Sequence, residues 1–195
     1  RPIALVIHGG AGAIAKDKMS PTLEAQYRQT LAEVTAAGYA VLAQGGTSLE
    51  AVEAAIVLME DSPLFNAGKG SVMTHDDTVE MDASVMDGAT GNAGAVAGVQ
   101  TLRNPIRAAM RVMTHSQHVL LSGAGADAFG EAEGLAQEAP AYFQTEQRRQ
   151  QLERVRRRGA VELDHGSPAS GIEPGVTDKI GTVGAAVSYT HLTLP

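Results

Sequence analysis

The residues best placed to do chemistry stand at Gly181-Thr182, where a glycine precedes a hydroxyl residue that opens a run of small residues ending at Val187. The Thr182 hydroxyl could attack the Gly181 carbonyl, because glycine permits strained backbone dihedrals and has no side chain to block the approach. The amide would become an ester, and water would then split the chain. Thr182 would gain an α-amino group, whose ordinary pKa of about 7.7 to 8 suits a general base. Nucleophile and base would then share one residue.

A Gly-Thr pair at the start of a strand is common, so the rest of the chain has to support this interpretation. The chain has 195 residues and is 44% hydrophobic, which indicates one packed domain. Aromatic residues make up only 4%, so small and aliphatic side chains must fill the interior. The longest apolar runs, 3–7 and 54–59, are far shorter than the roughly 20 residues that span a bilayer. We expect a soluble protein with no membrane partner.

Cysteine is absent, so neither disulfides nor thiolate chemistry is available, which fits a cytoplasmic location. The chain opens with Arg1-Pro2 and carries no charged-then-apolar leader. We therefore expect a cytoplasmic protein whose signal peptide, if it had one, is already lost.

The first elements are a strand, a glycine-rich loop and two helices. The apolar run 3–7 predicts a buried strand that ends at the loop His8-Gly9-Gly10-Ala11-Gly12. Helical spacing of apolar residues over 21–44 predicts a long amphipathic helix with Ser20 as its N-cap. The capping box Thr47-Ser48-Leu49-Glu50 opens a second helix that ends before Pro63.

The loop over 62–71 is the second informative stretch. Its Gly68-Lys69-Gly70-Ser71 segment is not a phosphate-binding Walker loop, because Gly70 follows Lys69 at the position where that motif needs Ser or Thr. Glycines on both sides of a lysine turn main-chain carbonyls inward, which suits a hard monovalent cation or a neighbouring strand. Asn66 is the side chain here that can both donate and accept near a reacting amide.

The middle of the chain predicts an antiparallel hairpin followed by further helices and a strand. Apolar and polar residues alternate over 78–87, and a glycine-rich turn leads into a second small-residue run over 92–100. The acidic residues around this hairpin lack the glycine and final glutamate of a calcium loop. Further elements are a helix over 105–113, a strand over 118–122 and a helix over 124–137. The element order favours an antiparallel sheet core with helices outside.

An arginine-rich segment over 146–158 carries six Arg against two Glu. A non-catalytic nucleic-acid-binding module using Arg148 to Arg158 is one hypothesis, since clustered positive charge attracts phosphate. However, the segment has no aromatic residue to stack on a base, and the net charge of the whole chain is −7. We favour a solvated helix face and expect no nucleic-acid partner.

Four stretches, in this order along 3–187, resemble the plant-type asparaginases and isoaspartyl peptidases, a family of N-terminal-nucleophile hydrolases. The stretches are His8-Gly9-Gly10-Ala11-Gly12, Pro63-Leu64-Phe65-Asn66-Ala67-Gly68, Asp82-Ala83-Ser84-Val85-Met86-Asp87-Gly88 and Gly181-Thr182-Val183-Gly184-Ala185. Each stretch alone is a weak signal. The ordered set is specific.

The resemblance implies an α+β fold, an αββα sandwich that is incomplete in this chain. It also implies autoproteolysis between Gly181 and Thr182, followed by hydrolysis of isoaspartyl (β-aspartyl) peptides or L-asparagine. Thr182 is then the nucleophile and base, with Asn66 close to it. The substrate is a small molecule or dipeptide. A glycosylasparaginase or a threonine endopeptidase of the same superfamily is the alternative.

The resemblance further implies a structural sodium ion, with no cofactor needed for the chemistry. The matching main-chain carbonyl ligands are Met59, Glu60, Ser62, Phe65, Ala67 and Lys69. The family more often has an apolar residue where this chain has Lys69.

The resemblance also divides the chain. Residues 1–181 match the α-subunit part, with a polar linker over about 159–181, and 182–187 match the first strand of the β-subunit. Residues 188–195 do not resemble the family's continuation, so we expect a non-native tail. The family continues with residues for the oxyanion hole and the substrate, which leaves substrate-binding residues unassigned here. We expect an inactive fragment whose partner is its own β-subunit, in a dimer of αβ units.

Overall fold

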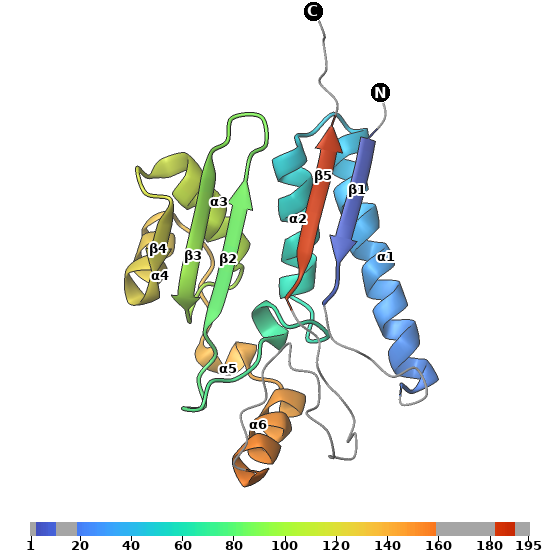
Figure 1. Ribbon diagram of the computed structural model, residues 1–195, viewed down its shortest axis with the longest axis vertical. Coiled ribbons are helices and arrows are strands. Elements are labelled where there is room, and N and C mark those ends of the chain that lie inside the picture. Colours follow the sequence, from blue (N-terminus) through green and yellow to red (C-terminus); the bar gives the residue numbers. More distant parts are fainter. Residues whose placement is uncertain (1–2, 11–18, 159–181, 190–195) are drawn as a thin grey trace, which may run out of the picture.

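The strands of the protein form two small sheets. The structure, a computed structural model, describes residues 3–10, 19–158 and 182–189. The first sheet pairs β1 (Ile3–His8) with β5 (Gly184–Tyr189), and the second sheet has the order β2 (Met81–Met86), β3 (Ala93–Val99) and β4 (Leu120–Ser122) (Figure 1). The helices are α1 (Pro21–Ala43), α2 (Ser48–Glu60), η2 (Gly68–Gly70), α3 (Pro105–His115), α4 (Gly123–Ala132), α5 (Pro140–Phe143) and α6 (Glu146–Arg158).

The first sheet joins segments from opposite ends of the chain. Strands β1 and β5 are antiparallel, with Cα partners running from Ile3 opposite Tyr189 to His8 opposite Gly184. Strand β5 therefore starts two residues after Thr182 and continues two residues past the predicted strand end at 187. Helix α1 packs on β1 and α2 packs on β5.

The second sheet contains the predicted hairpin. Strands β2 and β3 are antiparallel, and along β2 the side chains of Met81 and Val85 are buried while Asp82 and Met86 are exposed, which confirms the predicted alternation. Strand β4 runs parallel to β3, so the prediction of an antiparallel core was incomplete. The physical reason is that α3 crosses over between these two strands and returns the chain in the same direction.

Local signals place the long helices where the sequence predicts them. The Ser20 hydroxyl accepts a hydrogen bond from the Leu23 N–H, and Pro21 occupies the first position of α1. At α2, Thr47 and Glu50 form the reciprocal capping box. Helix α4 is shorter than predicted because the chain turns at Gly134, whose φ is +73°. Helix α5 was not predicted.

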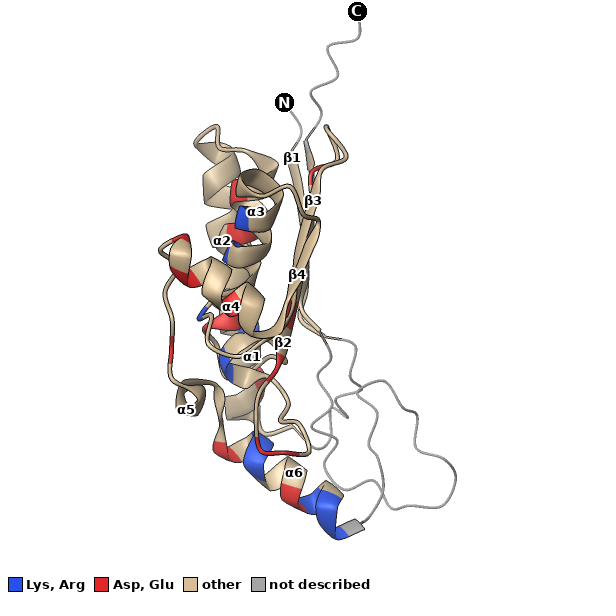
Figure 2. Ribbon diagram, turned by 90° about the vertical axis from the view of Figure 1, so that its left-hand side faces the viewer, with Lys and Arg blue, Asp and Glu red and all other residues tan. Residues whose placement is uncertain are grey.

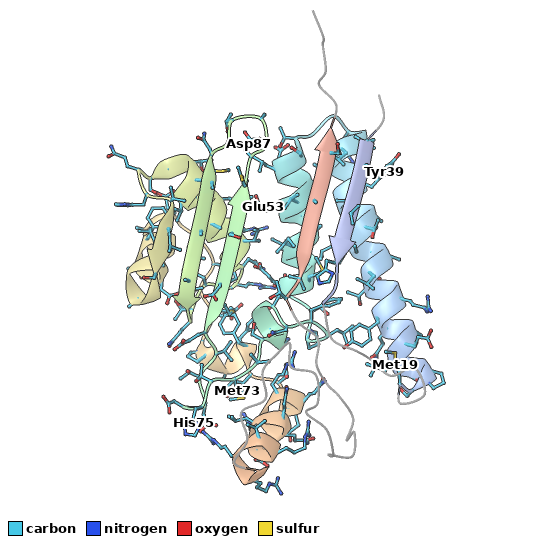
Figure 3. All side chains as sticks on the ribbon, in the orientation of Figure 1. Met19, Tyr39, Glu53, Met73, His75 and Asp87 are labelled. Carbon is cyan, nitrogen blue, oxygen red and sulfur yellow. The ribbon has the colours of Figure 1, made fainter. Side chains whose placement is uncertain are left out.

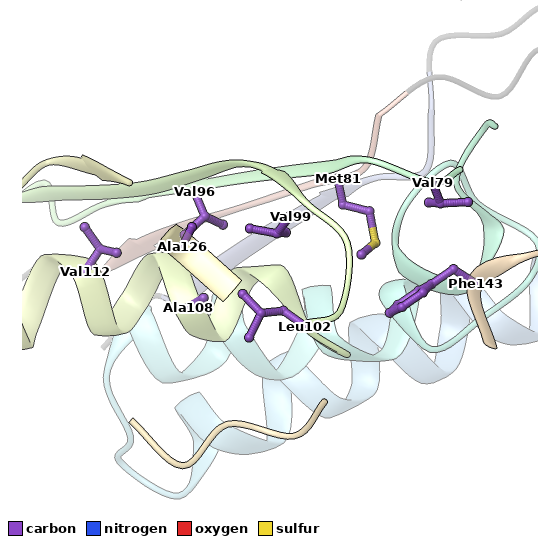
Figure 4. Close-up of a cluster of buried hydrophobic side chains, with 9 residues drawn as sticks. All are labelled: Val79, Met81, Val96, Val99, Leu102, Ala108, Val112, Ala126 and Phe143. Carbon is purple, nitrogen blue, oxygen red and sulfur yellow. The ribbon is translucent and has the colours of Figure 1, made fainter. Parts of the chain in front are cut away.

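The described helices α1 to α4 lie on one side of the strands (Figure 2). On that side, strands β1, β5 and β2 pack with α1, α2 and α3 around buried Val34, Met59 and Phe65. The second cluster lies between the second sheet, α3 and α4 and contains Val79, Met81, Val96, Val99, Leu102, Ala108, Val112, Ala126 and Phe143 (Figure 4). The fold is therefore mixed α and β, with its core between one helical layer and the strands.

The opposite side of the strands carries exposed apolar side chains. The exposed fractions are 68% for Val6 in β1, 65% for Met86 in β2 and 55% for Leu120 in β4. A sandwich would cover this face with a second sheet, because large apolar side chains on one sheet face favour burial.

Candidate functional site

Thr182 is exposed and lies just before β5, at the end of the first sheet where His8 pairs with Gly184. Gly9 and Gly10, which follow β1, lie at this same end, and Gly10 has φ +130°. The first glycines of the glycine-rich loop therefore lie at the same end of the sheet as the threonine. Gly181, the other residue of the predicted cleavage pair, lies outside the described residues.

A cavity of about 760 Å³ brings Thr182 and Asn66 together. Its walls come from α2, the loop over 62–71, the hairpin strands and the start of β5, so it lies between the two sheets. The lining residues that matter here are Glu60, Asn66, Gly68, Ser71, Thr182 and Val183. The two side chains that the sequence predicts to be catalytic, Thr182 and Asn66, therefore border one space, although 116 positions separate them.

A hydrogen bond within its own turn orients the Asn66 side chain. Its Oδ1 accepts the Val72 N–H at 2.8 Å. The other end of the amide is the Nδ2 group, which donates hydrogen bonds. A donor of this kind at the cavity can stabilise negative charge that develops on a carbonyl oxygen.

The turn around Gly68 and Gly70 is wound tightly. Gly68 has φ +51°, and a Cβ there would collide with the Glu60 carbonyl. A Cβ on Gly70 would collide with the Phe65 carbonyl and would lie 2.9 Å from the Pro63 oxygen. Both positions therefore require glycine, because main-chain carbonyls approach the backbone closely there.

Two side chains from distant helices hold other carbonyls of this loop. The Tyr27 hydroxyl on α1 donates to the Leu64 carbonyl at 2.9 Å, and Arg148 Nε on α6 donates to the Gly70 carbonyl at 2.8 Å. The Tyr27 ring also packs edge to face on Phe65, with centroids 5.9 Å apart. The loop is thus held by side chains of both α1 and α6.

The predicted sodium ligands all lie in this loop or at the end of α2. Met59, Glu60 and Phe65 are buried, whereas Ser62, Ala67 and Lys69 are half-buried. The carbonyls of Leu64 and Gly70, which accept the Tyr27 and Arg148 side chains, are outside the predicted set. The predicted ligands are main-chain carbonyl oxygens on a tightly wound loop. Such oxygens are the kind of ligand that a hard monovalent cation prefers.

Lys69 projects its side chain onto an aromatic ring. Its Nζ lies 5.0 Å from the centroid of Tyr142, and the guanidinium of Arg103 lies 5.4 Å from the same centroid. Tyr142 donates its hydroxyl to Asp61, and Arg103 donates Nε to the same carboxylate at 3.1 Å. Partial burial acts to raise the pKa of Asp61, but the bonds from Arg103 hold it below its ordinary value.

The side chain of Glu60 is a buried carboxyl group, whereas the sequence predicts only its main-chain carbonyl as a sodium ligand. Its side chain is 3% exposed, Oε1 accepts the Ile106 N–H at 3.0 Å, and Oε2 has no hydrogen-bond partner within the described ranges. Burial raises the pKa of Glu60 to about 8. Glu60 therefore caps the first turn of α3 while bordering the cavity.

The arginine-rich helix α6 packs against the protein along one side. Arg148 is 4% exposed, Leu152 is buried, and Arg156 pairs with the Asp77 carboxylate at 3.0 Å. Met73 and His75 lie at the end of the molecule that α6 occupies (Figure 3). The prediction of a solvated helix face was therefore wrong for Arg148, which faces inward on the same helical stripe as Leu152.

Sequence reasoning missed Arg148, Tyr27 and the side chain of Glu60 as parts of the site. The spacing of Arg148, four residues before Leu152, was an available signal for an inward-facing arginine. Within the described residues, no group of three or more His, Cys, Asp or Glu side chains is arranged to hold a metal ion. None of the described helices is long and apolar enough to cross a membrane.

Comparison with known proteins decides the family. A family model described as Asparaginase matches residues 1–194. The chain belongs to this asparaginase family. It is an N-terminal-nucleophile hydrolase family, and its relatives include curated isoaspartyl peptidases and plant-type L-asparaginases.

Three relatives illustrate the similarity. The isoaspartyl peptidase of Salmonella typhimurium is 48% identical over 93% of this chain and 56% of its own length. The plant-type L-asparaginase of Pyrococcus furiosus is 44% identical over 80% of this chain and 48% of its own length. The human isoaspartyl peptidase/L-asparaginase is 38% identical over 94% of this chain and 55% of its own length. The chain thus spans about half the length of the curated relatives it matches.

Proposed function

We propose that the asparaginase family protein containing this chain hydrolyses isoaspartyl peptides and L-asparagine, with Thr182 as its nucleophile. The observation that carries the proposal is the cavity between the two sheets, because it is bordered by both Thr182 and Asn66. A hydroxyl nucleophile and an amide donor at one space are two of the parts that amide hydrolysis needs.

The first step of the proposal is cleavage of the chain itself. The Thr182 hydroxyl attacks the Gly181 carbonyl, the C–N bond breaks, and the acyl group passes to oxygen as an ester. The nitrogen of Thr182 takes up the proton and becomes a free amine. Water then hydrolyses the ester, which leaves a carboxylate on Gly181 and returns the hydroxyl to Thr182.

The second step uses the same hydroxyl on the substrate. The Thr182 oxygen attacks the side-chain amide of asparagine or the isoaspartyl peptide bond, while the new α-amine takes the hydroxyl proton and passes it to the leaving amine. Water hydrolyses the acyl-enzyme and releases aspartate. The ordinary pKa of an α-amine, about 7.7 to 8, allows both transfers near neutral pH.

Replacement of the nucleophile tests the proposal. In the full-length protein, Thr182→Ala should abolish both self-cleavage and turnover of β-aspartyl-leucine and L-asparagine, and Thr182→Ser should retain part of each. Thr114→Ala, on the exposed end of α3, is the matched control. Mass spectrometry should find a fragment beginning Thr-Val-Gly in the wild type. Wild-type turnover by Thr182→Ala would refute the proposal.

The same assay separates the related activities. Release of a sugar-linked amine from glycosylated asparagine would indicate a glycosylasparaginase, and cleavage of ordinary α-peptide bonds would indicate a threonine endopeptidase. We propose the isoaspartyl and asparagine activity because the curated relatives named above carry those two names.

We also propose that the carbonyls of the loop over 59–69 hold a sodium ion that fixes the loop without taking part in the chemistry. The tight turns at Gly68 and Gly70 support this, since the carbonyls of Glu60 and Phe65, two of the predicted ligands, approach the loop backbone closely there. Replacing sodium by a bulky organic cation should lower the melting temperature. A ligand at 100 times its Kd stabilises by about 2.7 kcal/mol, so the shift is measurable. An unchanged melting temperature would contradict the site.

Finally, we propose that residues 1–181 form the α-subunit part and residues 182–187 begin a β-subunit, with two αβ units forming the active dimer. The exposed apolar face of the strands supports the need for more chain. Residues 1–195 alone should therefore aggregate or need a complementing chain, and should not turn over substrate. A soluble, active monomer would contradict this division.

A further inference from the structure

Arg148 differs from the other described arginines of α6 because it is buried. Its side chain is 4% exposed, its Nε donates to the Gly70 carbonyl at 2.8 Å, and its Nη1 donates to Gln151 Oε1 at 2.8 Å. A buried guanidinium is tolerated only where its hydrogen bonds are satisfied. The bond to Gly70 fixes α6 against the loop that carries Asn66.

The carbonyl that Arg148 holds belongs to the same turn that orients Asn66. The Gly70 N–H donates to the Ala67 carbonyl at 3.1 Å, and two residues later the Val72 N–H donates to Asn66 Oδ1 at 2.8 Å. The turn over 66–72 is therefore closed by Asn66 and held near its centre by Arg148. A displacement of Gly70 shifts Val72 and, through it, the Asn66 amide.

The turn has little room to absorb such a displacement. Both Gly68 and Gly70 are buried, and a Cβ on either would collide with main-chain carbonyls of Glu60 and Phe65. Closely packed backbone transmits a shift to its neighbours rather than absorbing it. The position of the Asn66 amide at the cavity thus depends on the contact that Arg148 makes.

We propose that Arg148 is a positioning residue for the site at Thr182: it holds the turn over 66–72 so that the Asn66 Nδ2 group faces the cavity. This inference rests on the proposed function, since it concerns the rate of the reaction assigned to Thr182. Arg148 itself does not border the cavity and does not touch the reacting atoms.

Other contacts keep α6 in place when Arg148 is changed, so its removal is a local perturbation. Arg156 pairs with Asp77 and donates to the His75 carbonyl, Leu152 is buried, and the Gln144 amide donates to the Asp77 carbonyl at 3.0 Å. An Arg148 variant should therefore keep the helix while losing the contact to Gly70.

The experiment compares Arg148→Met with Arg157→Met in the full-length protein, or in a chimera that continues this chain with the remaining residues of the Salmonella typhimurium isoaspartyl peptidase. Arg157 lies on the same helix, and its side chain is 75% exposed. We expect Arg148→Met to lower kcat for β-aspartyl-leucine about 10- to 100-fold with KM changed less than about twofold, the size of effect that a misplaced active-site group produces. Arg157→Met should match the wild type.

A double-mutant cycle distinguishes positioning from a merely structural role. If Arg148 acts through Asn66, the variant Asn66→Ala with Arg148→Met should be no slower than Asn66→Ala alone. Arg148→Lys, which keeps the charge and fills the buried space, should recover part of kcat. If Arg148→Met does not fold, Arg148→Lys takes its place in the kcat comparison and in the double-mutant cycle.

Each result has a distinct meaning. Additive losses in the double variant, or wild-type kcat in both Arg148→Met and Arg148→Lys, would overturn the positioning role while leaving Thr182 as the nucleophile. Wild-type turnover by Thr182→Ala would overturn the proposed function, and this inference with it.

Discussion

The two sheets of this protein differ in how they are assembled and in how completely they are covered. The second sheet forms from residues 81–122 in sequence, and its inward side chains Val96 and Val99 are 1% and 0% exposed. The first sheet pairs strands from opposite ends of the chain, and its inward residues Ile3, Leu5 and Ile7 are only half-buried.

The difference locates the candidate site. The half of the molecule around the second sheet closes its core with α3 and α4, whereas the half around the first sheet is less closed and carries Thr182. The cavity lies between them. The half with the closed core therefore lies across the cavity from the more accessible half, which carries the proposed nucleophile.

The largest test of this contrast removes core volume from each half. Leu102 is fully buried in the second cluster, so Leu102→Ala should lower the free energy of unfolding by about 2 to 5 kcal/mol. Leu5→Ala, in the half-buried strand β1, should cost about 1 to 2 kcal/mol, because less apolar surface is lost. Urea unfolding followed by circular dichroism measures both. Equal losses would show that the two halves are equally closed.

The next prediction concerns the contact between the halves, where Glu60 at the end of α2 caps α3. Its pKa is raised from 4.5 to about 8 by burial, so the folded state binds more protons than the unfolded state between these values. The stability from Glu60 is therefore complete below pH 4.5 and is lost as the pH rises to about 8.

Glu60→Gln provides the matched comparison, because the amide keeps an acceptor for Ile106 but does not titrate. Between pH 5 and pH 8 the wild type should lose on the order of 3 kcal/mol relative to this variant, since one pKa unit corresponds to about 1.4 kcal/mol. Urea unfolding at constant sodium concentration measures the difference. Parallel pH profiles would mean that Glu60 is charged in the folded protein.

Two strand glycines, one in each half, test how closely the neighbouring elements pack on each strand. A Cβ on Gly94 in β3 would collide with the Ala109 carbonyl of α3, whereas a Cβ on Gly184 in β5 would meet only His8 Cβ, at 3.6 Å. Gly94→Ala should therefore cost about 2 to 3 kcal/mol, and Gly184→Ala less than about 0.5 kcal/mol. A shift in melting temperature reports each. The reverse order would contradict the described packing of α3 on β3.

The smallest expected effect is at the loop of the site. Tyr27→Phe removes the hydroxyl that donates to the Leu64 carbonyl but keeps the ring on Phe65, so it should cost about 1 kcal/mol. Tyr39→Phe is the control, because Tyr39 is 53% exposed on the outer side of α1 (Figure 3). If both substitutions have the same effect on the unfolding midpoint, the Tyr27 hydroxyl does not support the loop.

Much of the fold was predictable because its signals are local. The N-cap at Ser20 and the capping box of Thr47 and Glu50 act within three residues, and the alternation along β2 needs only the strand itself. The parallel direction of β4 and the pairing of β1 with β5 were not predicted, since they depend on packing between distant segments. The early end of α4 was also missed, although Gly134, where the chain turns, lies inside the predicted helix.

The candidate site, too, was predictable in part. The motif order pointed to Thr182 and Asn66, and the structure brings both to one cavity. The geometry of cleavage remains a prediction, because Gly181 lies outside the described residues. Arg148 was missed because a charged residue in an arginine-rich segment is most often solvated, and only the folded contact with Gly70 reveals its burial.

The pairing of β1 with β5 has a consequence for the proposed self-cleavage. The cut would make two polypeptides, yet each would retain one strand of the same antiparallel ladder, from Ile3 opposite Tyr189 to His8 opposite Gly184. Hydrogen bonds along this ladder would take over the tethering that the peptide bond had supplied. The two products should therefore migrate together in native gels and separate only in denaturant, so the proposed cleavage would change the number of chains without releasing either one.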